Sequence, residues 1–240
     1  MFPYDPRLLA LLQTQPASIV DVLATMQAID ALTVDGDGLK WFNWLYFQVT
    51  QAVESRVASG GFSDSIFLST LDVQFAALYF NALKGSLDNQ PIPACWQALF
   101  SCRSDVRLAR IQCALAGINA HINHDLPLAI VATCQAMNLT PQHGAIQYTD
   151  YTNLNTTLDS LIESAKQTLH VRLLGDALPP VSVLEDTVAA WSVSAAREAA
   201  WNNAEILWHL QSEPQLTSAF LGNLDGITSV IGKTLLVPIP

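Results

Sequence analysis

The sequence is organised around one stretch, Gly117-Ile118-Asn119-Ala120-His121-Ile122-Asn123-His124-Asp125-Leu126-Pro127. It closes a long apolar run and places two histidines, two asparagines and an aspartate within seven residues. Residues four apart on an α-helix lie one turn apart on the same face, so His121 and Asp125 point in the same direction. Because this geometry suits two ligands of one metal ion, we expect the chemistry of the chain to be concentrated here.

The segment before this stretch has the apolar spacing of a long helix that begins at Ser104 or Asp105. Its apolar residues recur every three or four positions: Val106, Leu108, Ile111, Leu115, Ile118 and Ile122. Pro127 lacks an N–H, and its ring would clash with the carbonyl of Asn123. We therefore predict a break or kink near Asp125, with helix resuming over residues 128–137.

Similar spacing occurs along most of the chain, and no strand-like alternation or repeat is evident. The longer predicted helices cover residues 17–32, 40–59, 64–84 with Gly85 as its stop, 150–171, 182–211 and 214–237, and residues 175–180 form a break. We predict an all-α fold, a single-domain bundle of about eight helices over residues 1–240.

The composition limits the function classes. Half of the residues are hydrophobic and 13% are charged, against a usual quarter, so the chain has ample material for a folded core. The net charge of −10, with four lysines, argues against nucleic acid and against docking on anionic membranes. The most apolar stretches, Trp41 to Val53 and Ile227 to Pro240, are short or interrupted by polar residues, so we predict no membrane span.

The cysteines and the first residues bear on the expected location. Met1 to Pro6 contains no basic region followed by an apolar run, so no secretion signal is predicted. The four cysteines form no Cys-x-x-Cys pair and are expected to be buried thiols rather than disulfides or a zinc knuckle. We therefore expect a cytoplasmic protein.

Asp72 is the third candidate for the metal site. Leu68, Phe75 and Ala76 lie three or four residues from it and Tyr79 two turns on, so its carboxylate is on the apolar face of a predicted helix. A buried carboxylate must be paired, hydrogen-bonded or metal-bound, and a structural ion pair is the alternative interpretation. We predict that Asp72, His121 and Asp125 hold a divalent metal, zinc being the first candidate.

The residues around this metal are assigned catalytic or substrate-binding roles. His121, His124 and Arg197 are the catalytic candidates, although His124 could instead favour the negative end of a helix and Arg197 could pair with Asp72 or Asp125. In the functional interpretation Arg197 binds an anionic group of the substrate. The aromatic stretch from Trp41 to Phe47 forms either a central core helix or the wall of a ligand pocket. The predicted substrate contacts are Asn43, Trp44, Tyr79, Asn119, Asn155 and Trp201.

Four stretches of the chain resemble one known family. They are the stretch quoted above, Leu71 to Phe75 with Tyr79, Asp150-Tyr151 leading to Asn155, and Ala196 to Trp201. Together they resemble the signature of a bacterial family, number 5995 of the domains of unknown function. The resemblance covers most of the chain and implies an all-helical domain without pointing to an activity.

A second resemblance is weaker. The spacing of His121 and Asp125 is similar to the His-x-x-x-Asp zinc ligands of the helical phospholipase C and nuclease group. The later histidines and the N-terminal tryptophan of those three-zinc sites are missing here. This resemblance therefore implies at most one or two ions.

Two hypotheses of function follow. The first is a metal-dependent enzyme, a hydrolase being the first candidate, that acts on a largely apolar small molecule with an anionic group. The second is a metal-free helical bundle that binds, or shapes the reaction of, a hydrophobic small molecule. No Gly-x-Ser-x-Gly elbow, phosphate-binding glycine loop or dinucleotide fingerprint is present, so serine hydrolases, nucleotidases and dehydrogenases have no support.

Overall fold

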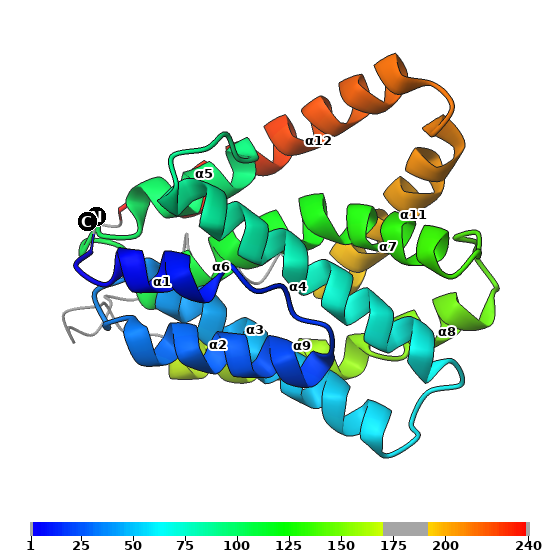
Figure 1. Cartoon of the computed structure of the whole chain (residues 1–240), viewed down its shortest axis with the longest axis horizontal. Helices are drawn as coiled ribbons and strands as arrows, with labels where there is room; N and C mark the ends of the chain where they lie inside the picture. The colour runs from blue at the N-terminus through cyan, green and yellow to red at the C-terminus, as the bar shows by residue number, and fades with distance from the viewer. Residues whose placement is uncertain (1, 170–191, 239–240) are drawn as a thin grey trace.

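Helices account for nearly all of the regular structure, as the apolar spacing predicts. The computed structural model describes residues 2–169 and 192–238, and over these residues it contains helices and loops but no strand (Figure 1). The predicted all-α bundle is confirmed. The first six helices are α1 (Asp5–Leu11), α2 (Ile19–Leu32), α3 (Gly38–Ala58), α4 (Ser65–Leu87), α5 (Ala94–Cys102) and α6 (Arg110–Ala120). They are followed by the π-helix η1 (His121–Asp125), α7 (Leu126–Ala136), α8 (Ile146–Thr152), α9 (Asn155–Thr168), α11 (Val193–Leu210) and α12 (Pro214–Leu235).

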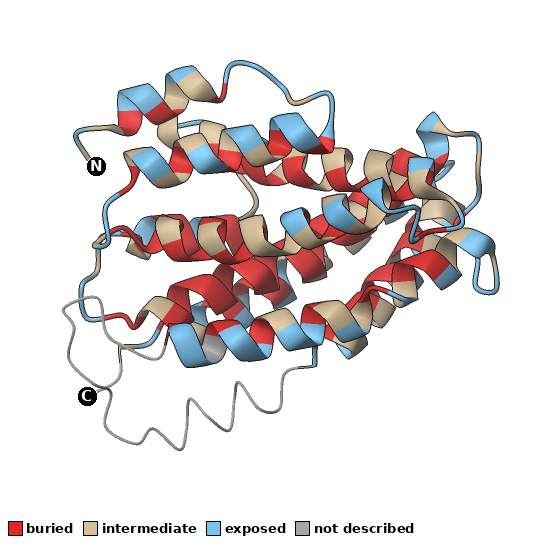
Figure 2. Ribbon diagram, turned by 90° about the horizontal axis from the view of Figure 1, so that it is seen from below, coloured by how far each residue is buried: buried red, intermediate tan, exposed pale blue. Residues whose placement is uncertain are grey.

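The centre of the bundle is the continuous segment α6–η1–α7. Helix α6 packs against α3, α5 and α12, and every residue of α6 after the first is buried. Helix α7 packs against α4 and α11. Figure 2 shows that the surrounding helices turn their buried faces inward and their exposed faces to solvent. The polar motif of this segment is therefore in the interior of the molecule.

A close approach of α3 to α6 depends on a glycine. A Cβ at Gly117 would lie 2.7 Å from Cβ of Phe42 and closer still to two carbons of the Phe42 ring. Such distances do not occur between real side chains, so only glycine fits here. The Phe42 ring then packs edge-on against Tyr79, Trp96 and His121, at centroid distances of 4.9, 5.2 and 5.7 Å.

Three predicted helix boundaries are wrong. The helix predicted from Ser104 or Asp105 begins at Arg110, because Asp105 Oδ1 accepts the N–H of Arg107 in a turn. Helix α4 continues through Gly85, where a Cβ would meet Ile92 Cγ2 at 2.7 Å, so this glycine serves packing rather than helix termination.

The third error concerns the helix predicted over residues 150–171. It is two helices, α8 and α9, separated by two residues. Asp150 starts neither of them, because its carboxylate accepts the N–H of Asp64 at the entrance of α4 instead. Residues 170–171, the predicted break at 175–180 and the first part of the helix predicted over 182–211 lie outside the described residues.

Among the described residues, α4 is long and apolar enough to cross a membrane by length and composition. Half of its most apolar window is buried inside the bundle. The core helix of a globular protein passes the same test of length and composition, so this property of α4 is weak evidence for a membrane span.

Candidate functional site

The polar motif adopts a π-helix rather than the predicted break. The N–H of Leu126 bonds to the carbonyl of His121, five residues back, and α7 follows directly. Pro127 falls at the second residue of α7, where the missing N–H of proline is tolerated. Single π-turns are rare and occur frequently at functional sites. The disturbance predicted from Pro127 is thus present, in the form of a wider helical turn.

Asp125 is a buried acceptor shared by two histidines and a tryptophan. Its Oδ2 accepts the indole N–H of Trp96 at 2.9 Å and lies 3.1 Å from His121 Nδ1, while its Oδ1 lies 2.8 Å from His124 Nδ1. Burial alone would raise the pKa of Asp125, but the hydrogen bonds from His121 and His124 outweigh it and hold that pKa below its ordinary value. Because an ionised carboxylate only accepts, the hydrogen of each bond lies on Nδ1 of the histidine, and in the neutral form of such an imidazole Nε2 is the acceptor.

His121 is enclosed by aromatic rings. Its imidazole stacks on Phe75 with a centroid distance of 3.4 Å and meets the Tyr46 ring at 4.4 Å. Burial lowers the pKa of His121 despite the opposing effect of Asp125, which favours the neutral imidazole. Its Nε2 is buried and has no hydrogen-bond partner among the described residues. The same is true of the Tyr46 hydroxyl and of Asp72 Oδ2.

Asp72 and Arg197 line one small space, here called the interior cavity. It has a volume of about 40 Å³, and its remaining walls are aromatic and aliphatic side chains from α3, α4, α7 and α9: Tyr46, Val49, Val53, Leu68, Leu71, Phe75, Leu126 and Leu158, with Leu154 between α8 and α9. Burial raises the pKa of Asp72 to about 7, so this carboxyl is about half neutral near pH 7.

Arg197 is held in place by neutral groups. Its Nε donates to Asn155 Oδ1 at 2.7 Å, and its Nη2 donates to the carbonyl of Tyr151 at 2.8 Å. The guanidinium carbon lies 3.9 Å from the centroid of the Tyr151 ring. No described carboxylate, Asp72 and Asp125 included, lies within 4.0 Å of the Arg197 nitrogens. The guanidinium is thus a buried cation whose described hydrogen-bond partners are uncharged.

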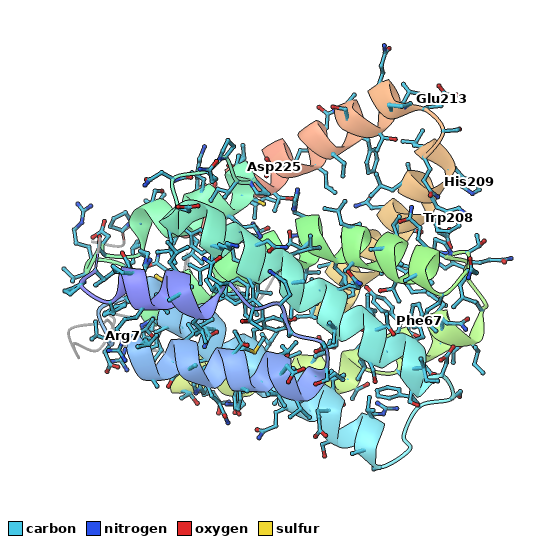
Figure 3. The ribbon with its side chains drawn as sticks, in the orientation of Figure 1. Arg7, Phe67, Trp208, His209, Glu213 and Asp225 are labelled. Carbon is cyan, nitrogen blue, oxygen red and sulfur yellow. The ribbon has the colours of Figure 1, made fainter. Side chains whose placement is uncertain are left out.

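His124 faces a second space, here called the α12 groove, which has a volume of about 650 Å³. It lies between η1, the end of α11, residues 214–225 of α12 and the residue that precedes α5, and is lined by Pro93, His124, Gln211, Pro214, Thr217, Ser218, Leu221, Gly222 and Asp225. Figure 3 shows Asp225 on the part of α12 that runs beside α5, with Glu213 at the opposite, N-terminal end. The donor atoms of Cys95, His124 and Asp225 all lie within 4.8 Å of one another.

The family of the chain is clear from comparison with family models. The model described as Family of unknown function (DUF5995) matches residues 19–238. The chain belongs to this family. No curated protein and no solved structure matches it. The DUF5995 resemblance of the sequence is therefore confirmed, whereas nothing in the comparisons supports the weaker resemblance to zinc phospholipases and nucleases.

The four stretches that carry the resemblance to DUF5995 converge on the interior cavity and its aromatic wall. Asp72 and Arg197 line the cavity, Asn155 holds Arg197, and His121 lies behind the Phe75 ring that forms part of the wall. They come from α4, α11, α9 and η1. Residues far apart in the sequence are thus assembled around one small space.

The predicted metal ligands do not form one set. His121 and Asp125 are brought together, as their spacing predicts, but the two oxygens of Asp125 are already shared by three N–H groups. Asp72 lies at the interior cavity instead. Among the described residues, the donor atoms of Cys95, His124 and Asp225 lie close enough together to bind one ion. The donor atoms of Asp72, His121 and Asp125 do not form such a set among these residues.

The predicted pairing of Arg197 with Asp72 or Asp125 is wrong, because no described carboxylate lies within 4.0 Å of the Arg197 nitrogens. His121 lines neither the interior cavity nor the α12 groove. A direct catalytic role of His121 on a molecule in either space is therefore not supported by the geometry. Of the other predicted catalytic residues, His124 lines the α12 groove and Arg197 lines the interior cavity.

The predicted substrate contacts mostly have structural partners. Asn43 donates to the carbonyl of Met26 and accepts from the Tyr79 hydroxyl, and Asn119 donates to the carbonyl of Thr228 on α12. The indole N–H of Trp201 donates to Glu205, and Trp44 is half-buried against the core. None of Asn43, Trp44, Tyr79, Asn119, Asn155 and Trp201 lines the interior cavity or the α12 groove. Asn43, Tyr79, Asn119, Asn155 and Trp201 each have a polar atom that is hydrogen-bonded within the protein, which is the commoner fate of buried polar groups.

Sequence reasoning missed Tyr46 as a polar group of the cavity, and Cys95 and Asp225 as metal-ligand candidates. Tyr46 was within the aromatic stretch assigned to a pocket wall, so that signal was available. Cys95 and Asp225 are 130 residues apart in the chain. No spacing pattern links residues so distant, and only the packing of α12 on α5 brings them together.

Proposed function

We propose that this protein binds a small, largely apolar molecule with an anionic group in the interior cavity and shapes the reaction of that molecule. One observation carries the proposal. A buried arginine with only neutral described hydrogen-bond partners lines the same apolar space as Tyr46 and Asp72, two residues that each have a buried polar atom without a described partner. Buried polar groups are normally hydrogen-bonded and buried charges paired, so a ligand that satisfies them is favoured.

Arg197 supports an anionic end of the ligand. A guanidinium has five N–H groups, of which Asn155 and the carbonyl of Tyr151 take one each. The remaining N–H groups can donate to a carboxylate, and a charge-assisted hydrogen bond is about twice as strong as a neutral one. Asp72 does not oppose this anion when protonated, since a neutral carboxyl donates a hydrogen bond, as does the hydroxyl of Tyr46.

The remaining walls support a short apolar body. Side chains such as Val49, Leu68 and Leu158 offer no polar atom to a ligand. A volume of about 40 Å³ corresponds to about three water-sized probes, since one water needs ~10–15 Å³ on this measure. The ligand class that fits is a straight-chain monocarboxylate of about four to six non-hydrogen atoms.

Isothermal titration calorimetry with the carboxylate series from acetate to hexanoate tests the proposal. We expect a dissociation constant near 1 mM, which is equivalent to a binding free energy of about −4 kcal/mol. Ligands of this size can reach such a value, because the best small ligands gain up to ~1.5 kcal/mol per non-hydrogen atom. We expect affinity to rise with chain length and then fall once the chain exceeds the cavity. The primary amides of the same lengths, which lack the charge, should bind at least tenfold more weakly.

Two α3 variants give a matched pair for this experiment. Val49→Phe fills the interior cavity and should abolish binding, whereas Val57→Phe adds the same volume at a half-buried position outside the cavity and should retain it. Arg197→Met should weaken carboxylate binding more than amide binding. Equal affinity for acids and amides, or unchanged binding by Val49→Phe, would refute the proposal.

A metal-dependent enzyme of the hydrolase class is the second candidate function. It is favoured by the cluster of Cys95, His124 and Asp225 at the α12 groove. In this case the metal would polarise a substrate or activate water from the groove.

A further inference from the structure

We propose that the protein has a zinc site, separate from the interior cavity, whose ligands are Cys95 of α5, His124 of η1 and Asp225 of α12. One sulfur, one ring nitrogen and one carboxylate oxygen lie within 4.8 Å of one another. Each comes from a different element, so the site forms only in the folded chain. This inference does not depend on ligand binding in the interior cavity.

The orientation of His124 supports a ligand role. Its Nδ1 is bonded to Asp125 Oδ1 at 2.8 Å, which leaves Nε2 as the nitrogen available to a metal. Metal-bound histidines almost always donate their other ring N–H to a carboxylate or carbonyl in this way. Asp125 is itself fixed by the indole N–H of Trp96 at 2.9 Å. The imidazole is therefore preorganised before any metal arrives.

Asp225 is held beside the Cys95 thiol by backbone hydrogen bonds. Its Oδ2 accepts the N–H of Ala94 and its Oδ1 accepts the N–H of Cys95, both at 2.8 Å. An ionised carboxylate has about four acceptor positions, so these bonds leave lone pairs for a metal. The carboxylate of Asp225 is thus fixed at the first turn of α5, next to the Cys95 sulfur, which is another of the three proposed ligands.

The ligand types favour zinc over magnesium and calcium. A thiolate, an imidazole and a carboxylate are all zinc ligands, whereas magnesium and calcium prefer oxygen alone. On binding, the Cys95 thiol would release its proton to solvent and the sulfur would bind as thiolate, with no change in oxidation state.

The α12 groove gives the site an open position. His124 and Asp225 line this groove of about 650 Å³. Zinc sites with three protein ligands and a fourth position open to water are of the catalytic type, whereas structural zinc sites have four protein ligands. The ion would thus be accessible to a molecule held between α11 and α12.

The first test measures zinc on the untagged full chain, after dialysis against a weak chelator, by mass spectrometry and by competition with a chromogenic chelator. We expect one bound zinc per chain in the wild type and its loss in Cys95→Ser and His124→Gln. Cys134→Ser and His209→Gln change the same residue types away from the site and should keep the ion. Equal zinc content in the site variants and the controls would overturn the proposal.

The second test has two parts, and the first of them uses the wild-type chain, so that it does not depend on a variant that folds. Cobalt added in place of zinc should give the near-ultraviolet charge-transfer band of a cobalt–thiolate bond, and a bound ion without that band would overturn the role of Cys95. Asp125→Asn should lower the zinc affinity by about 10–100-fold with the stoichiometry unchanged, the usual effect of removing a carboxylate behind a metal-bound histidine. An affinity equal to that of the wild type would exclude the proposed orientation of His124.

Discussion

Replacing Gly117 with alanine should destabilise the protein, although alanine is the better helix former. The new Cβ would lie 2.7 Å from Cβ of Phe42 and nearer to two carbons of its ring. The Phe42 ring cannot move aside freely, because it is fully buried and packs against Tyr79, Trp96 and His121. Helix α3 or α6 must therefore shift to accommodate one methyl group.

The magnitude follows from two opposing effects. Overpacking of a well-packed core destabilises by about 1–3 kcal/mol, and the contact of Gly117 with the Phe42 ring places this site at the upper end. Exchanging glycine for alanine inside a helix stabilises by about 1 kcal/mol. We expect a net loss of about 2 kcal/mol in the free energy of unfolding. For a chain of this size that corresponds to a fall of about 4–8 °C in Tm.

Urea unfolding followed by circular dichroism measures this difference. The matched control is Gly222→Ala in α12, where a Cβ would meet nothing within 4 Å. The control should stabilise the protein by about 0.4–1 kcal/mol, so the two substitutions have opposite signs. A Gly117→Ala variant as stable as the wild type would refute the argument that α3 and α6 are in contact through this glycine.

Three further predictions concern buried and titratable groups. Because burial raises the pKa of Asp72 to about 7 in the folded state, the contribution of Asp72 to the free energy of unfolding should fall as the pH rises from about 4 to 7. The difference between the wild type and Asp72→Asn in urea unfolding should therefore shift against the wild type from pH 5 to pH 8, and an equal difference at both values would contradict this. The hydrogen bond with Glu198 raises the pKa of His143 in the folded state, so the stabilisation by protonated His143 is complete below pH ~6.5 and is lost as the pH rises through the folded pKa. In thermal unfolding, His143→Gln should therefore lower Tm more at pH 6 than at pH 9, and an equal loss of Tm at both pH values would contradict this prediction. Asn43→Leu removes the donor to Met26 and the acceptor of the Tyr79 hydroxyl, and should lower the unfolding free energy in urea by about 1–3 kcal/mol, a neutral result being the contrary outcome.

The fold could be predicted because helices are encoded locally. Apolar residues at three- and four-residue spacing mark the buried face of a helix without knowledge of its partners. The boundaries at Asp105, Gly85 and Asp150 could not be predicted in the same way. Each depends on a local competition or a distant contact: the Asp105 side chain forms its own turn, Gly85 accommodates Ile92, and Asp150 bonds to Asp64.

The candidate site could be predicted only in part. The contact between His121 and Asp125 follows from one helical turn, so the spacing was sufficient. Asp72 was correctly expected on a buried face, but helical spacing says nothing about which other helix that face meets. The contacts of Arg197 and the approach of Cys95 to Asp225 are set by tertiary packing alone, and no pairwise pattern in the sequence indicates them.

The π-turn of η1 also sets how far α7 is rotated relative to α6. A π-turn contains about one residue more than an α-turn, since its hydrogen bond spans five residues instead of four. Deleting one residue from His121–Asp125 would turn the segment after it by about 100°, the angle between neighbouring residues on a helix. Ala129 and Ile130, which are now buried, would then point away from their present neighbours. Because of this extra residue, the continuous helical segment α6–η1–α7 can pack its α6 part against α3 and its α7 part against α11.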